Sequence, residues 1–203
     1  MQKTVVIIDD SPISRATLGG ALKRLGFEVI GEGASGAEAV HLAHKLEPDV
    51  LFLAVGLPDM DGLTVAAHIL ETLPIPILVL SSHLDQELIQ RAKEAGVMAY
   101  LLKPLREEEL LPAIELAISR FEEFNALRKE NADLKRILED RKLIERAKGI
   151  LMERERISEQ QAFSRIQKTS MNMRRSMAEI AQAILLSEAV TAGRSTAPVA
   201  GVP

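Results

Sequence analysis

The chain has 203 residues, enough for one ordinary domain and a smaller second one, and 47% of them are hydrophobic. No apolar run approaches the roughly 18–20 residues that a membrane-spanning helix needs, and the N-terminus lacks a secretory signal pattern, so a cytoplasmic protein with no membrane contact is expected. The absence of cysteine excludes disulfides and thiolate metal sites.

Charge is unevenly distributed along the chain, whose net charge is −4. Residues 1–138 carry 14 basic and 21 acidic side chains, whereas residues 139–190 carry 10 and 8. A basic C-terminal part is compatible with nucleic-acid binding, although so small an excess does not establish it.

Residues 1–120 alternate short apolar runs with amphipathic stretches, a pattern typical of βα units around a parallel sheet. We therefore expect an α/β domain with a doubly wound, five-stranded parallel sheet. Helix-start signals occur at Ser11–Pro12 and in the capping box Ser35–Glu38, and Gly26 and Gly96 are placed where helices end. The expected strands are Thr4–Ile8, Phe27–Ile30, Val50–Leu53, Ile75–Leu80 and Ala99–Leu102.

Polar residues follow three of these strands at their carboxyl ends, where parallel sheets bind ligands. They are the acidic pair Asp9–Asp10, Ser81 and Lys103. Together with Gly-Leu-Pro-Asp-Met-Asp-Gly at 56–62 and Tyr-Leu-Leu-Lys-Pro at 100–104, they resemble the response-regulator receiver domain over about residues 1–120. The resemblance implies that Asp9 and Asp10 are metal ligands, Ser81 is the switch hydroxyl, Lys103 is the phosphoryl-pairing cation and Tyr100 is the rotating aromatic.

The resemblance also places an aspartate that accepts the phosphoryl group at the end of the third strand, where this chain has Ala54. A methyl group has no oxygen with which to form an acyl phosphate or to bind Mg²⁺. We therefore predict no phosphorylation at this position, no required cofactor, and weak or absent Mg²⁺ binding at Asp9 and Asp10. Lys103 is expected to pair with Asp10 instead. A natural pseudo-receiver and a laboratory Asp→Ala substitution both account for Ala54.

A long helix is expected over residues 106–140, because neither glycine nor proline occurs between Pro112 and Gly149. Apolar residues in it recur at heptad spacing, and an asparagine at a central a position favours a parallel two-stranded register. The helix is thus predicted to join two chains into a homodimer; the alternative is an amphipathic linker packed on its own receiver. The predicted dimer contacts are Phe124, Leu127, Asn131, Leu134 and Leu138.

Residues 139–190 are predicted to form three helices, the first through Ile150 and the others opened by capping boxes at Ser158–Gln161 and Ser176–Glu179. Ala-Lys-Gly-Ile-Leu-Met at 147–152, followed by Ser158 and Ala-Phe at 162–163, resembles the ANTAR family of RNA-binding antitermination domains. The resemblance implies a regulator that binds tandem RNA hairpins in nascent transcripts as a dimer. Residues 191–203 are expected to be a disordered tail.

Within this domain, basic residues at exposed or terminal helix positions are the predicted RNA contacts, because they can reach phosphates or bases. A glycine in mid-helix indicates a close neighbour at that point. Phe163, the domain's single aromatic residue, is expected to be buried, which would leave base contacts to arginine, lysine, Ser170, Asn172 and methionine. The predicted contacts are Arg141, Lys148, Gly149, Arg174 and Arg175.

Two other functions fit the same pattern less well. A DNA-binding response regulator would need arginines on its recognition helix, and the last predicted helix has few. A protein-interaction scaffold would show no nucleic-acid affinity. An enzyme is not expected, since no nucleophile–base pair occurs outside the receiver site.

Overall fold

The computed structural model describes residues 2–83 and 86–194. The chain divides into two compact units, Met1–Ala126 and Leu127–Pro203. Among the described residues, no helix has the length and apolar character that crossing a bilayer requires.

The first unit is built on a five-stranded sheet of order β2-β1-β3-β4-β5, in which every neighbouring pair is parallel. This confirms the predicted doubly wound α/β fold. The five strands are β1 (Thr4–Ile8), β2 (Glu28–Gly33), β3 (Val50–Ala54), β4 (Ile77–Ser81) and β5 (Ala99–Leu102).

Strand β2 extends three residues beyond its predicted end at Ile30. Glycine commonly marks a turn, but Gly31 and Gly33 lie inside this strand, where the ends of side chains from the neighbouring helix and strand occupy the space that a side chain would take. A Cβ on Gly31 would lie 2.7 Å from Leu46 Cδ1, and one on Gly33 would lie 2.8 Å from Ile8 Cδ1. These glycines therefore allow close packing within the strand and do not end it.

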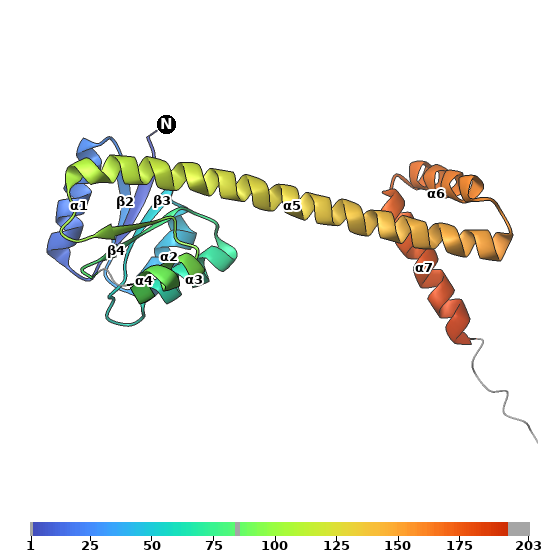
Figure 1. Cartoon of the computed structure of the whole chain (residues 1–203), viewed down its shortest axis with the longest axis horizontal. Helices are drawn as coiled ribbons and strands as arrows, with labels where there is room; N and C mark the ends of the chain where they lie inside the picture. Colours follow the sequence, from blue (N-terminus) through green and yellow to red (C-terminus); the bar gives the residue numbers. More distant parts are fainter. Residues whose placement is uncertain (1, 84–85, 195–203) are drawn as a thin grey trace, which may run out of the picture. The chain divides into compact units, whose positions relative to one another are not determined.

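Helices cover both faces of the sheet (Figure 1). Helix α1 (Pro12–Arg24) and the beginning of α5 (Glu107–Glu155) share one apolar core with alternate strand residues such as Ile7 and Phe52. The other alternate residues, such as Ile8 and Leu53, pack with the remaining three helices on the opposite face. Those helices are α2 (Gly36–Leu46), α3 (Gly62–Thr72) and α4 (Gln86–Glu94).

The predicted helix ends in this unit are mostly confirmed. Ser11 Oγ accepts a hydrogen bond from the Ser14 N–H at 3.3 Å, and Gly26 and Gly96 have φ angles of 88° and 79°. The capping box at Ser35 is only half formed, because Glu38 Oε2 accepts from the N–H of Ala34 instead of Ser35.

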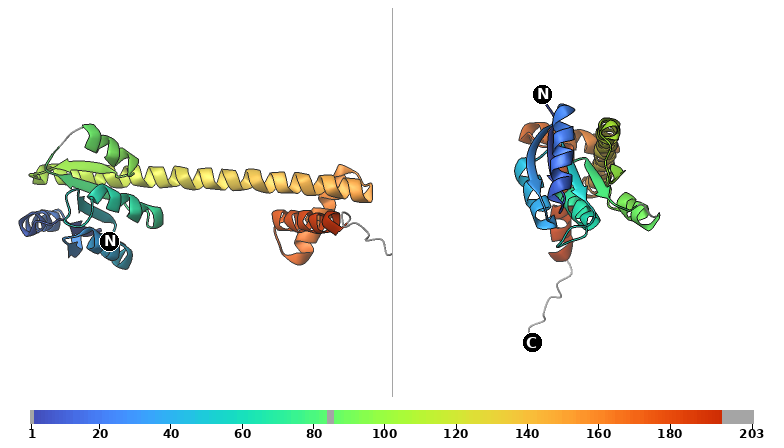
Figure 2. Two further views of the ribbon diagram at one scale, coloured as in Figure 1. Left: turned by 90° about the horizontal axis from the view of Figure 1, so that it is seen from below. Right: turned by 90° about the vertical axis from the view of Figure 1, so that its left-hand side faces the viewer.

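In the second unit, the end of α5 packs with α6 (Glu159–Met173) and α7 (Met177–Arg194), as Figure 2 shows. The predicted linker helix and first output helix are one continuous helix, since the cost of Gly149, about 1 kcal/mol, is too small to break it. The expected capping boxes at Ser158 and Ser176 both have their two hydrogen bonds. The buried core is Ala147, Leu151, Ala162, Ile166, Ile180 and Ala181.

Helix α7 reaches Arg194, so residues 191–194 are helical and the predicted tail begins too early. The rest of the predicted tail, residues 195–203, lies outside the described residues.

Candidate functional site

The carboxyl ends of the strands bring the predicted receiver residues together. Ile8 pairs with Leu53, so the residues that follow them, Asp9 and Ala54, are adjacent at the edge of the sheet. Ser81 pairs with Leu102, the residue before Lys103. Asp9, Ala54 and Ser81 are buried, whereas Lys103 is partly exposed.

Lys103 forms an ion pair with Asp9 Oδ2, and the predicted pairing with Asp10 is wrong. The reason is burial: the Asp9 side chain faces inward and is 1% exposed, whereas Asp10 is exposed. The other oxygen, Asp9 Oδ1, accepts a hydrogen bond from the Ser11 N–H at 3.0 Å. Asp9 is therefore paired and hydrogen-bonded, the condition under which a buried carboxylate is tolerated.

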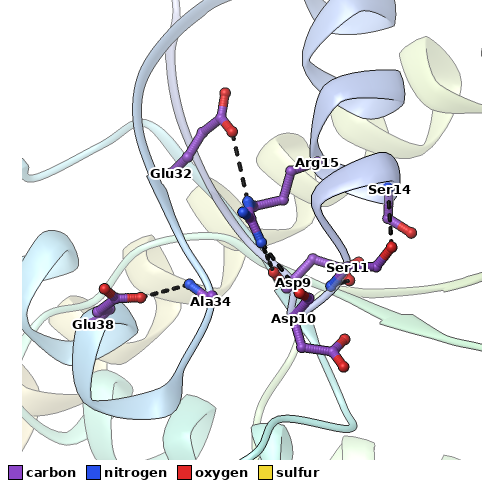
Figure 3. Close-up of polar contacts among 8 residues, drawn as sticks. All are labelled: Asp9, Asp10, Ser11, Ser14, Arg15, Glu32, Ala34 and Glu38. Atoms are coloured by element: carbon purple, nitrogen blue, oxygen red, sulfur yellow. Dashed lines mark hydrogen bonds and ion pairs between the residues drawn. The ribbon is translucent and has the colours of Figure 1, made fainter.

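Arg15 is a second cation at this site, and it is not among the residues predicted from the sequence. Its Nη1 donates to the backbone carbonyls of Asp9 at 2.5 Å and Asp10 at 3.4 Å, and its Nε lies 3.7 Å from Glu32 Oε2 (Figure 3). The only sequence signal is its place one and a half helical turns after the acidic pair. Arg15 holds the β1–α1 turn, whereas Lys103 neutralises its buried acid.

These residues do not make a good Mg²⁺ site. Mg²⁺ requires near-octahedral oxygen coordination, and the strand ends supply one carboxylate already paired with Lys103 and one exposed carboxylate, Asp10. Throughout the described part of the chain, no three acidic, histidine or cysteine side chains gather in a way that could hold a metal ion.

The acids of the loop after β3 are engaged elsewhere. The Asp59 carboxylate accepts the N–H groups of Gly36 at 2.7 Å and Ala37 at 3.0 Å, and these bonds lower the pKa of Asp59. Asp61 caps α3 and pairs with Arg91. Neither carboxylate therefore substitutes for an acceptor at residue 54.

Ser81 and Tyr100 meet at one backbone carbonyl. Ser81 Oγ donates to the His83 carbonyl at 2.9 Å, and Tyr100 Oη donates to the same oxygen. The two predicted switch residues are thus joined through the segment that follows β4.

Gly62 lies directly against the backbone at the end of β3. Its N–H donates to the Val55 carbonyl at 2.8 Å, and a Cβ on Gly62 would lie 2.0 Å from the Ala54 carbonyl oxygen. We expect Gly62→Ala to destabilise the receiver unit by about 1–3 kcal/mol, since backbone must move to make room. Chemical denaturation measures this change. Gly56→Ala is the matched control, because its Cβ would meet nothing within 4 Å; equal losses in both variants would contradict the close contact.

Lys148 is buried in the second unit, contrary to its predicted role as an RNA contact. Only 7% of the residue is exposed, and Nζ donates to Glu145 Oε1 at 2.9 Å and Glu159 Oε1 at 2.7 Å. Hydrogen bonds to these carboxylates raise the pKa of Lys148. Lys148 therefore holds α6 to α5, and its ammonium is not presented to a phosphate.

We expect Lys148→Met to lower the melting temperature more than Lys142→Met, which removes an exposed i, i+3 pair with Glu139 on the same helix. The hydrogen bond from Lys148 lowers the pKa of Glu159 in the folded protein. The Lys148–Glu159 pair therefore stabilises the fold fully above the ordinary glutamate pKa, and this contribution is lost as the pH falls below about 4.3. Thermal unfolding across this pH range should show a flatter acid limb for Lys148→Met. Equal melting temperatures for the two variants would contradict the role of Lys148.

The close neighbour predicted at Gly149 is absent within the described chain, since a Cβ there would meet nothing within 4 Å. The other predicted contacts, Arg141, Arg174 and Arg175, are exposed. Arg174 ends α6 in the left-handed conformation, and Arg175 pairs with Glu179 at 3.0 Å.

Helix α6 and the two arginines after it are strongly basic. Residues 159–175 contain four basic side chains and one acid, Glu159, which is paired with Lys148. A depression of about 560 Å³ on α6 includes Arg165 and Lys168 in its lining. Arg165 and Lys168 lie on α6 itself, and Arg165 pairs with Glu155 at the end of α5. The weak basic excess of the C-terminal part is therefore concentrated in residues 159–175.

Phe163 is 41% exposed, so its predicted burial is wrong. The core positions on α6 are Ala162, Ile166 and Ser170, spaced i, i+4 and i+8. Phe163 is one residue, or about 100°, away from that line.

The predicted dimer contacts lie on α5 as an exposed stripe. Phe124, Leu127, Leu134 and Leu138 are each at least half exposed, and Asn131 between them is also exposed. This single chain therefore leaves the apolar side chains of the heptad seam accessible to solvent.

Family models match both units: the response regulator receiver domain over residues 5–115 and the ANTAR domain over residues 132–185. The receiver domain of the putative response regulator NarL from Mycobacterium tuberculosis has a TM-score of 0.56 and 32% identity, over 58% of this chain and 97% of that one. The fold and the residues at its strand ends thus define a response regulator, a class of regulators rather than enzymes.

More particularly, the chain belongs to the response regulators that carry an ANTAR domain, a family of RNA-binding domains. It is 42% identical over 183 residues to the transcriptional regulatory protein PdtaR of Mycobacterium tuberculosis, covering 90% of this chain and 89% of the relative. The response regulator protein VraR of Staphylococcus aureus is 36% identical over 112 residues, about 54% of each protein.

Proposed function

We propose that the protein is a transcription antitermination regulator that binds tandem RNA hairpins through its second unit. The observation that carries this proposal is the concentration of positive charge along α6 and directly after it, where residues 159–175 contain four basic side chains and one acid, Glu159, which is paired with Lys148. Phosphate contacts supply most of the affinity of such interfaces, and a basic helix in an ANTAR domain provides them.

The receiver unit acts in this proposal without phosphorylation. Ala54 ends β3 beside Asp9, at the position where the receiver resemblance requires an acceptor aspartate. Its methyl group cannot form an acyl phosphate, and Lys103 is already paired with Asp9. The unit therefore serves as a pairing or docking platform.

Two chains associate through the heptad seam of α5 in a parallel arrangement. Support comes from the exposed leucines at heptad spacing and from Asn131, whose polar side chain at an a position favours a two-stranded parallel register. Such a dimer presents two ANTAR domains, which matches an RNA with two hairpins.

Fluorescence anisotropy with a labelled tandem-hairpin RNA tests the function. We expect binding at least ten-fold tighter than to an unpaired RNA of equal length at the same salt concentration, with affinity falling as salt rises. A DNA duplex of equal charge is the control for the runner-up function. Equal affinity for all three nucleic acids would remove the proposal.

A further inference from the structure

We propose that helix α6 binds an unpaired RNA base on the ring of Phe163. The contact surface is a stacking stripe, which consists of Phe163, Gln167 and Met171 along α6 and Arg174 at its C-terminal end. This inference rests on the proposed RNA-binding function and specifies which side chains distinguish a hairpin loop from a plain stem.

The stripe is a continuous exposed face. Phe163, Gln167 and Met171 follow one another at i, i+4 and i+8, so they lie along one side of the helix. Phe163 is 41% exposed and Met171 is 67% exposed. Arg174 is exposed at the C-terminal end of α6, three residues after Met171.

The packed side of α6 lies next to the stripe and holds it in place. Ala162 and Ile166, on the neighbouring side of the helix, are fully buried against α5 and α7. The capping box at Ser158 and the Lys148–Glu159 pair fix the start of the helix. The Phe163 ring is therefore presented by an anchored helix, which limits the entropy lost when a base stacks on it.

The stripe combines an aromatic ring with nearby positive charge, and this combination suits an unpaired RNA base. Phe163 is the single aromatic residue between positions 127 and 203, and it lies on the helix where basic residues are concentrated. An unpaired nucleotide combines a flat base, which can stack on a ring, with a negatively charged phosphate. Sequence-specific RNA recognition commonly stacks such bases on aromatic rings and arginine planes. A hydrophobic surface on a second protein would match Phe163 and Met171 but not Lys168, Arg174 and Arg175.

The experiment uses the full chain, which contains no tryptophan. Phe163→Trp introduces one as a reporter at the stripe, and we expect tandem-hairpin RNA to quench its fluorescence while binding stays close to that of the unsubstituted protein. Leu186→Trp, at an exposed apolar position on α7, is the matched control and should bind without comparable quenching.

Phe163→Ala is expected to weaken binding to the hairpin RNA by about 10- to 100-fold, the range that corresponds to loss of one stacked base. Its affinity for an RNA duplex with the same stems and no loops should not change. Phe163→Tyr should retain hairpin affinity, which separates the loss of a ring from a loss of folding.

The outcomes distinguish this inference from the function on which it rests. Full hairpin affinity in Phe163→Ala, or no quenching in Phe163→Trp, would overturn the stacking stripe while antitermination by RNA binding stands. No preference for the hairpin RNA in the unsubstituted protein would overturn both. A Phe163→Ala chain that changes its oligomeric mass in light scattering would assign the stripe to a protein contact instead.

Discussion

Incubation with Mg²⁺ and acetyl phosphate is expected to leave the mass of this protein unchanged, whereas Ala54→Asp should gain one phosphoryl group. The substitution places a carboxylate beside Asp9 at the carboxyl end of the sheet, close to Lys103. It supplies both the nucleophilic oxygen and a third oxygen ligand for the metal. Intact-protein mass spectrometry measures whether the mass of one phosphoryl group has been added.

Two variants make this experiment specific. Ala54→Asn keeps the size of the added side chain but has no carboxylate, so it should remain unlabelled. Ala54→Asp combined with Lys103→Met should not be labelled, since the ammonium expected to pair with the phosphoryl group is removed. A phosphoryl group on the unsubstituted chain would show that another aspartate accepts it and would remove the proposed receiver role.

Replacement of Leu127 and Leu134 by serine is expected to convert the proposed dimer into a monomer. A fully buried leucine contributes about 1.5–3 kcal/mol, so four such side chains across two chains contribute about 6 kcal/mol or more. The dissociation constant should therefore rise by about 10⁴-fold. Light scattering measures the mass, which should fall from twice 22.2 kDa to that of one chain.

Lys129→Ser with Arg136→Ser is the control, because these residues lie on the opposite side of α5 from the heptad seam and incur a similar helix-propensity cost. This variant should remain dimeric. A monomeric unsubstituted protein, or equal dissociation in both variants, would refute pairing through the seam. Asn131→Ile should strengthen association while admitting other registers, as expected for removal of a polar a residue.

Much of the receiver site follows from local pattern. A parallel sheet gathers the carboxyl ends of its strands at one edge, so Asp9, Ser81 and Lys103 converge once the strands are recognised. The absence of a side-chain oxygen at Ala54 is equally a property of the sequence. The partner of Lys103 does not follow from the sequence, because Asp9 and Asp10 both lie at the carboxyl end of β1. Only the packing shows which of the two faces inward.

Local sequence patterns are enough to predict the order of elements, the helix caps at Ser11, Ser158 and Ser176, and the heptad spacing of α5, since each depends on residues a few positions apart. The two carboxylates around Lys148 and the exposure of Phe163 become visible only in the packed helices. Both outcomes depend on which side of a helix meets another helix, and burial is set by those distant neighbours as much as by the residue's own polarity.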